Sequence, residues 1–246
     1  MRFPRLAKQF RSVLIWPFAA AAFVRSFPDR PTRLPALRRL AYWPKFGLSY
    51  NKVKKNANTS VVLLLDHLQH EGEVSRRDAK WRTFGLFDVA LSELGRLAQY
   101  HYFIVIRDPY SRVLSAFLDK FRHEEFWSSY GDFPLDPDGF DSFLAWLKAG
   151  GLNKDPHWDL QIKLMVWPLE KYDTVIRFEN FAAEMHALFE SRNIQISAEL
   201  LEDVLPSDHG KKTSAADQLD RFYTPARRQL VAELFRDDFD ALGYRR

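Results

Sequence analysis

Residues 102–121, YFIVIRDPYSRVLSAFLDKF, contain the clearest indication of the fold. Positions 102–106 are aromatic and β-branched, which is typical of a buried strand, and the charged residues and proline after them interrupt that pattern. Positions 110–121 carry apolar residues at helical spacing. Asp108 suits the N-cap of this helix, and Pro109 suits its first turn because proline has no backbone N–H to leave unpaired. The stretch predicts a strand, a turn and a helix.

Residues 48–69, LSYNKVKKNANTSVVLLLDHLQ, predict the same order earlier in the chain. Positions 48–53 read as a short strand, 54–58 as a polar turn and 59–69 as a helix that opens with hydroxyl groups. The start of this helix is solidly apolar, as expected for a helix that packs between a sheet and other helices. Two such units in one chain indicate an α/β fold.

The remainder continues this alternation, without repeats or low-complexity segments. Hydrophobic residues make up 46% and aromatic residues 15% of the 246 positions, enough for one sizeable packed domain. Further predicted elements are a strand at 174–178 and helices at 140–148, at 158–167 and from 225 to about 235.

The charge and the cysteine content narrow the function only loosely. A formal net charge of +4 favours anionic partners. The chain has no cysteine, which excludes disulfides, thiolate metal ligands and a cysteine nucleophile. This absence fits a cytoplasmic protein.

The first forty residues differ from the rest in the arrangement of their basic, apolar and proline residues. Basic residues precede an apolar run at 13–24, which is the charge order of a signal peptide, but twelve apolar residues interrupted by Pro17 are too few to span a bilayer. We expect a surface or membrane-interface helix here, with a signal or anchor and a core helix as alternatives. Positions 25–39 carry three prolines and five arginines and predict an extended, unpacked connector. Residues 1–40 are therefore separated from a domain at 41–246.

The turn at 54–60, KKNANTS, has the composition of an anion-binding loop. A helix N-terminus offers N–H groups and the positive end of the helix dipole to an anion, and two lysines precede it here. The glycines and the Gly-Lys-Ser/Thr ending of the nucleotide-triphosphatase P-loop are missing, which weakens a kinase interpretation. A solvated turn followed by an ordinary helix cap is the alternative.

Arg107 follows the second predicted strand, at the sheet edge where open α/β folds bind ligands. Ser115 lies eight positions further on, near the helix face that also presents Ser111. An arginine and a hydroxyl together suit a phosphate group. Alternatively, Arg107 pairs with Asp108 or Glu179.

Together, the loop at 54–60 and RDPYSRVLSAFLDKF at 107–121 resemble the family 2 carbohydrate sulfotransferases, which include chondroitin and HNK-1 sulfotransferases and bacterial relatives. The resemblance implies a single P-loop-like three-layer domain, with a short central parallel sheet flanked by helices. It also implies 3′-phosphoadenosine-5′-phosphosulfate (PAPS) as sulfuryl donor. The residues it assigns to the donor are Lys54, Lys55, Asn58, Thr59 and Ser60 at the 5′-phosphosulfate, and Arg107 and Ser115 at the 3′-phosphate.

The similarity extends over about 48–244. HWDLQ at 157–161 is similar to the family's His-Trp-x-x-Gln segment, and 172–179 is similar to its Tyr-Asp strand that ends in a glutamate. The end of the chain, 235–244, resembles the family terminus imperfectly. Lys54 stands where the family usually has proline, Asn58 where it has cysteine or glycine, and the family's cysteines after the His-Trp segment are absent.

The resemblance implies roles for two catalytic residues. Lys55 would stabilise the charge that grows on the leaving oxygen. His157 is the first choice for the general base, with Trp158 placed to stack on a sugar ring. Helix capping is the alternative role of His157. The other candidates for the general base are His67, His70, Asp159 and Glu179. Lys212, beside Lys211, would close over the nucleotide.

The expected acceptor is a hydroxyl of a glycan or polysaccharide, and Arg227 and Arg228 would suit an acidic one. We expect no metal, since no His/Asp cluster has ligand spacing, and no nucleic-acid partner. Peripheral membrane contact would go through the N-terminus, and the sequence specifies no oligomeric state. The rival interpretations are a P-loop-like kinase of a small metabolite and a non-catalytic glycan-binding protein.

Overall fold

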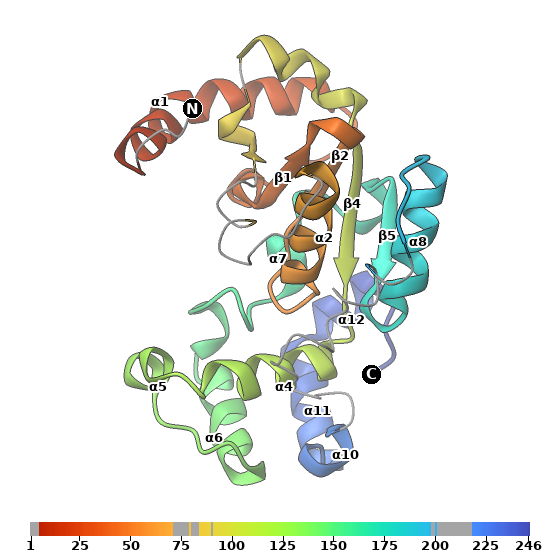
Figure 1. Cartoon of the computed structure of the whole chain (residues 1–246). Coiled ribbons are helices and arrows are strands. Elements are labelled where there is room, and N and C mark those ends of the chain that lie inside the picture. The colour runs from red at the N-terminus through yellow and green to blue at the C-terminus, as the bar shows by residue number, and fades with distance from the viewer. Residues whose placement is uncertain (1–4, 71–78, 80–83, 90, 198–199, 201–217) are drawn as a thin grey trace.

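A five-stranded sheet in the order β3-β1-β2-β4-β5 lies at the centre of the protein, in a computed structural model that describes residues 5–70, 79, 84–89, 91–197, 200 and 218–246 (Figure 1). β2, β4 and β5 are parallel neighbours, whereas β1 runs antiparallel to both β2 and β3. The expected parallel sheet is therefore mixed at one edge. The strands are β1 (Leu40–Trp43), β2 (Leu48–Asn51), β3 (Phe84–Gly85), β4 (His101–Ile106) and β5 (Thr174–Arg177).

The antiparallel pairing of β1 and β2 has a local cause. Only Pro44–Phe46 and Gly47 connect the two strands, and a connection this short joins antiparallel strands but not parallel ones. Gly47 has φ 60°, in the left-handed region that glycine adopts without steric cost.

Helices cover both faces of the sheet and its lower end (Figure 1). They are α1 (Arg5–Ser26), α2 (Asn58–His70), α4 (Pro109–Lys120), α5 (Glu124–Tyr130), α6 (Pro137–Lys148), α7 (Gln161–Leu164), α8 (Phe181–Ser191), α10 (Leu219–Phe222), α11 (Pro225–Leu234) and α12 (Arg236–Leu242).

The alternation of β4 shows how the layers form. Phe103 and Val105 belong to the core under α2 and α8, while Tyr102 and Ile104 belong to the core under α1. Successive side chains of a strand point to opposite faces, so a strand covered on both sides is apolar throughout. This accounts for the continuous apolar run at 102–106 and confirms the α/β fold with helices on both sides of the sheet.

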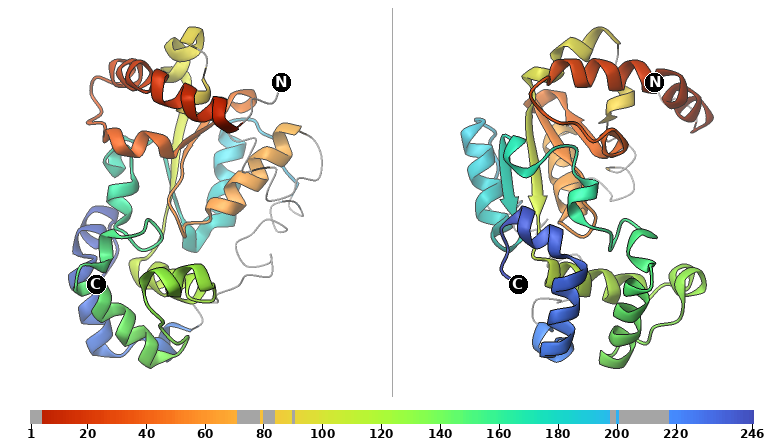
Figure 2. Two further views of the ribbon diagram at one scale, coloured as in Figure 1. Left: turned by 90° about the vertical axis from the view of Figure 1, so that its left-hand side faces the viewer. Right: turned by 180° about the vertical axis from the view of Figure 1, so that it is seen from behind.

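A third, aromatic core holds the helices beyond the carboxyl ends of the strands. It joins α4, α5, α6, α10, α11 and α12, which gather on this side of the sheet in all three views (Figure 2). Phe117 of α4 packs against Phe140 and Phe143 of α6 with ring centroids 5.2 and 5.5 Å apart. α4 is thus buried on most sides.

Most of the predicted elements are confirmed within two or three residues. Asp108 caps α4 by accepting from Ser111 N at 2.8 Å, and Thr224 caps α11 by accepting from Arg227 N at 3.3 Å. Pro109 and Pro225 stand in the first turns of α4 and α11, as predicted.

The helix predicted at 158–167 is wrong in extent, because α7 occupies only four residues. Buried Asp238 accepts from the N–H groups of Gln161 and Ile162 at 2.8 and 3.0 Å, which starts the helix late. Val166 N donates to Asn51 Oδ1 at 2.8 Å instead of continuing the helix. Hydrogen bonds to distant side chains therefore override the local helical pattern.

The N-terminal segment packs more closely than predicted. Ala19 and Phe23 of α1 are fully buried, and the Phe23 ring stacks on Trp167 with centroids 5.4 Å apart. Residues 34–39 form a 3₁₀ helix in which Ala36 and Leu37 are buried, so the prediction of an unpacked connector is wrong. This part of α1 matches the core-helix alternative, although Phe18 on its other side is 70% exposed. Across the described residues, no helix is long and apolar enough to cross a membrane.

Candidate active site

The two anion-binding segments meet at one end of the sheet. β2 and β4 are adjacent parallel strands, with Asn51 opposite Ile104, so the turns that follow them lie side by side (Figure 1). The first turn leads into α2 and the second into α4. Carboxyl ends of parallel strands are where open α/β sheets bind ligands.

The backbone after β2 is held in an unusual shape. Lys55 has φ 69° and Ala57 has φ 53°, both in the left-handed region that costs a residue with a side chain about 1–2 kcal/mol. Hydrogen bonds from other elements maintain this shape. Arg107 Nη1 donates to Lys55 O at 3.0 Å and Asn56 Nδ2 donates to Val105 O at 2.9 Å. The loop is therefore anchored on β4 and the turn that follows it.

The N-terminus of α2 presents the donors expected of an anion site. Val61 N donates to Ala57 O at 3.0 Å, so the N–H groups that precede it in the helix have no intrahelical partner. Thr59 is half-buried and Ser60 is buried beside them. Asn58 lies at the same turn, and its Oδ1 is buried without a hydrogen-bond partner. Asn58, Thr59 and Ser60 therefore lie at the start of α2, and their role at the donor stays a prediction.

Arg107 lies beneath this turn and is 5% exposed. Its Nε donates to Ser111 Oγ at 3.0 Å, and its guanidinium carbon lies 3.9 Å from the centre of the Phe178 ring. It donates to neither Asp108 nor Glu179, because Glu179 accepts from Asp108 N. Burial lowers the pKa of Arg107 to about 10, which leaves it charged at neutral pH. The alternative of a direct bond from Arg107 to Asp108 or Glu179 is therefore wrong, and the anion-binding role stays a prediction.

Ser115 lies one turn beyond Ser111 on α4 and is 3% exposed. Together with Asp119 these residues recur every four positions, so they share the helix face that is turned to the loop after β2. The structure therefore places Ser115 between Arg107 and Lys55, which is consistent with the predicted donor site.

Sequence analysis missed Arg112, which is fully buried. Its guanidinium donates to three carbonyl oxygens: Lys54 O at 3.1 Å, Asp159 O at 2.8 Å and Pro156 O at 3.3 Å. Burial lowers the pKa of Arg112 to about 10, so it too stays charged. Arg112 joins the loop after β2 to the segment that carries His157. Its place directly before the apolar pair Val113 and Leu114 was the available signal in the sequence.

Lys55 points at α4, where its Nζ lies 3.1 Å from Asp119 Oδ2. The Lys55 side chain is 14% exposed. Burial lowers the pKa of this ammonium to about 8, although the carboxylate of Asp119 opposes the change. The carbonyl groups of both lysines are held by arginines, that of Lys54 by Arg112 and that of Lys55 by Arg107.

His157 forms a dyad with Asp155, which sequence analysis also missed. The Nδ1 atom lies 2.5 Å from Asp155 Oδ1, and the same oxygen accepts from His157 N at 2.8 Å. Burial lowers the pKa of His157, with the neighbouring Lys120 and Lys54 in the same direction. No helix begins at His157, so the capping role is wrong.

Two other features of the His157 segment differ from expectation. Trp158 is fully buried, and its Nε1 donates to Gly151 O at 3.0 Å, so the predicted stacking on a sugar ring is wrong. Gln161 is also buried and donates from Nε2 to Arg107 O at 2.8 Å while accepting from Arg107 N at 3.1 Å. Gln161 therefore fixes the backbone from which Arg107 projects.

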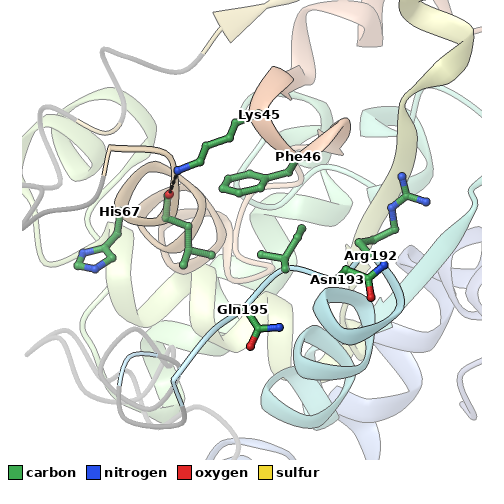
Figure 3. A pocket seen from close by; sticks show the side chains of 8 residues that line it. Lys45, Phe46, His67, Arg192, Asn193 and Gln195 are labelled. Carbon is green, nitrogen blue, oxygen red and sulfur yellow. Dashed lines mark hydrogen bonds between the residues drawn. The ribbon is translucent and has the colours of Figure 1, made fainter.

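The remaining candidates lie elsewhere. His67 lines a pocket of about 460 Å³ with Lys45, Phe46 and Arg192, at the end of the sheet where β2 begins (Figure 3). His70 lies 3.5 Å from Asp66, and Asp159 Oδ1 accepts from Leu160 N. None of these histidines joins the site. Lys211 and Lys212 lie outside the described residues.

A second hollow, of about 610 Å³, lies beside Asp108 at the start of α4. Arg228 and Arg245 line it, and Arg228 lies over the rings of Tyr110 and Tyr223 at 5.2 and 5.4 Å. Arg227 forms a bidentate ion pair, because its Nε and Nη2 donate to the two carboxylate oxygens of Asp141. This hollow is at the Arg107 end of the site, away from Lys55 and His157.

The described residues contain no group of three side chains suited to holding a metal ion. The donors that converge are instead an ammonium, guanidinium groups, hydroxyls and backbone N–H groups. That set matches an anion with several charged oxygens at separate positions. The fold and this set of donors are those of an α/β protein suited to an anionic ligand at the carboxyl end of its sheet.

The comparison with protein families identifies the class further. The model of the sulfotransferase family matches residues 38–245, and the chain belongs to this family. It is thus a transferase of sulfuryl groups. No curated protein and no solved structure matches it.

Proposed function

We propose that the protein transfers a sulfuryl group from PAPS to a hydroxyl of a glycan or polysaccharide. The observation that supports this most is the convergence of Lys55 and Arg107 on one loop, where Arg107 Nη1 holds the Lys55 carbonyl at 3.0 Å. PAPS carries two anionic ends, and the site has a cation for each. PAPS supplies the activated sulfuryl group and a good leaving oxygen.

The residues of the chain divide the work by position. Arg107 and Ser115 hold the 3′-phosphate, with Thr59, Ser60 and the N–H groups of α2 at the other end. Lys55 stabilises the negative charge that develops on the leaving oxygen. A dyad such as Asp155 and His157 suits a general base, because the carboxylate holds Nδ1–H and leaves Nε2 to accept a proton.

The pH dependence of turnover follows from these roles. His157 has a lowered pKa, so it is neutral and able to accept a proton once the pH exceeds that value. Lys55 is protonated only below about pH 8. We expect kcat/KM for the donor to rise with pH in the acid range and to fall above about pH 8, which a pH series at donor concentrations below KM and saturating acceptor measures.

The donor site is tested by calorimetry with 3′-phosphoadenosine-5′-phosphate, the desulfated product, without magnesium. We expect micromolar binding, about −8 kcal/mol, that Arg107→Ala weakens by at least ~10-fold and that ATP does not match. Arg192→Ala is the matched control, because Arg192 is an exposed arginine of the pocket at the other end of the sheet. A folded protein that does not bind the nucleotide would overturn the proposal. Magnesium-dependent ATP binding would favour a kinase.

The carbohydrate acceptor is inferred from the resemblance at 54–60 and 107–121. We expect the acceptor to enter the site on the side of His157, where Lys54 and Lys120 lower the pKa of His157. These cations, rather than Arg227 and Arg228, would meet an acidic polysaccharide. Transfer of labelled sulfate from PAPS to chondroitin and to neutral dextran tests whether the acceptor is a polysaccharide and whether it has to be acidic. Salt-dependent glycan binding without transfer would indicate a glycan-binding protein.

We place the protein in the cytoplasm, in contact with a membrane surface through α1. The support is the absence of cysteine and the exposed side of α1, where Phe18 is 70% and Val24 40% exposed. Co-sedimentation with anionic vesicles should fall for Phe18→Glu and stay unchanged for Ala187→Glu, an exposed position of α8. Equal binding by both variants would contradict membrane contact through α1.

A further inference from the structure

Asp119 lies where the loop after β2 meets α4. Its Oδ2 is 3.1 Å from Lys55 Nζ and 3.2 Å from Lys120 Nζ. It stands four residues after Ser115, on the face of α4 that is turned to the loop. The carboxylate therefore belongs to the same surface as the residues assigned to the donor.

The two lysines depend on Asp119 to different degrees. Lys120 has a second favourable contact, since its Nζ lies 5.0 Å from the centre of the Phe126 ring. Within the described residues, Asp119 Oδ2 is the only acceptor for the Lys55 ammonium. A buried ammonium without a partner is costly, so Lys55 needs this carboxylate more than Lys120 does.

The charges around Lys55 come from two elements. Asp119 and Lys120 face it from α4, and Arg107 faces it from the turn after β4. Burial, Arg107 and Lys120 all lower the pKa of Lys55, and only Asp119 raises it. Asp119 is thus the one group of this set that favours the protonated form.

A role for Asp119 as general base does not fit. Burial alone would raise its pKa, but Lys55 and Lys120 outweigh burial and lower it to about 2. A carboxylate this acidic is a poor proton acceptor near neutral pH. Any contribution of Asp119 to the reaction therefore has to act through Lys55.

We propose that Asp119 is a positioning residue for sulfuryl transfer: it keeps Lys55 protonated and aimed at the space between α4 and the loop until the donor arrives. This inference rests on the proposed function. When the donor binds, the ammonium exchanges its contact with Asp119 for one with the anionic donor, with no bond made or broken. Asp119 is then a source of charge repulsion for the donor as well as a guide for Lys55.

The first experiment measures Lys55 directly, by NMR titration of protein with ¹³C-labelled lysine, and needs no substrate. Lys55→Met identifies the resonance. We expect Asp119→Asn to lower the pKa of Lys55 by about one unit, Asp119→Glu to restore it and Lys120→Met to raise it slightly. An unchanged Lys55 pKa in Asp119→Asn overturns the inference.

The second experiment measures turnover and nucleotide binding. In Asp119→Asn we expect the alkaline fall of kcat/KM for the donor to begin about one pH unit earlier, so that kcat/KM at pH 9 drops ~10-fold. Affinity for 3′-phosphoadenosine-5′-phosphate should stay equal or improve, because a repelling carboxylate is gone. A loss of kcat/KM that is equal at every pH would indicate a merely structural role and overturn the inference. Failure of the wild-type protein to bind the nucleotide, with the Lys55 titration as expected, would instead overturn the proposed function.

Discussion

The two strand–turn–helix units of the site have the same order but are stabilised differently. The turn after β4 has a local cap, because Asp108 accepts from Ser111 N three residues away and Pro109 fits the first turn, and Gln161 holds the Arg107 backbone from outside it. The loop after β2 contains two left-handed residues and is held by Arg107, Arg112 and β4. The second unit thus supports the first.

This difference has a functional consequence. Lys55, the residue assigned to the chemistry, sits on the unit that cannot hold its own shape. Arg107, assigned to anchoring the donor, sits on the unit whose helix start is capped locally. A change in α4 should therefore disturb the loop after β2, while a change in that loop should leave α4 intact. The following variants test this dependence.

Arg112→Met should have the largest effect. It leaves three carbonyl oxygens of two segments without their donor, and we expect a loss of roughly 2–4 kcal/mol in the free energy of unfolding, measured with urea. Nucleotide affinity should fall too. Arg122→Met, at an exposed position just after α4, should change stability by less than about 0.5 kcal/mol. Equal midpoints for both variants would show that the loop supports itself.

Asn56→Ala should have the second-largest effect on stability. Asn56 Nδ2 donates to Val105 O at 2.9 Å and to Gln161 Oε1 at 2.6 Å, and both acceptors are buried. We expect a loss of about 1–3 kcal/mol in urea unfolding together with weaker nucleotide binding. Asn180→Ala, at an exposed position, is the control. Normal binding by Asn56→Ala would mean that β4 does not shape the loop.

Asp108→Ala and Asp136→Ala form a matched pair. Each aspartate caps its helix by accepting from the N–H three residues later at 2.8 Å. Each variant should lose about 1 kcal/mol of stability. Only Asp108 lies at the site, so only Asp108→Ala should alter nucleotide affinity in calorimetry. Equal affinities would place the turn after β4 outside the donor site.

Ala57→Gly should have the smallest effect, and it should be stabilising. Glycine removes the cost of φ 53° but makes the unfolded chain more flexible, which leaves a gain of about 0.5 kcal/mol. Ala187→Gly, exposed in α8, should lose about 1 kcal/mol. Destabilisation by Ala57→Gly in thermal unfolding would show that the left-handed residue is not strained.

Much of the fold could be predicted because its signals are local. The apolar run at 102–106 and the cap and proline at 108–109 each act over a few residues, and α4 forms as they predict. The shortness of α7 could not be predicted this way, because it depends on Asp238, 77 residues beyond Gln161. The antiparallel edge of the sheet was missed for another reason: its connection is local, but the pattern of the sequence did not reveal β1 as a strand.

By itself, the sequence determined the two strand–turn–helix units and the residue types that face an anion. The tertiary structure decided how those residues work. Lys55 and Asp119 are 64 positions apart, and Arg112 reaches carbonyl groups 58 and 47 positions away. A hydrogen bond across such a separation leaves no periodicity in the chain, and burial, which sets the pKa of Lys55, exists only once the layers have packed.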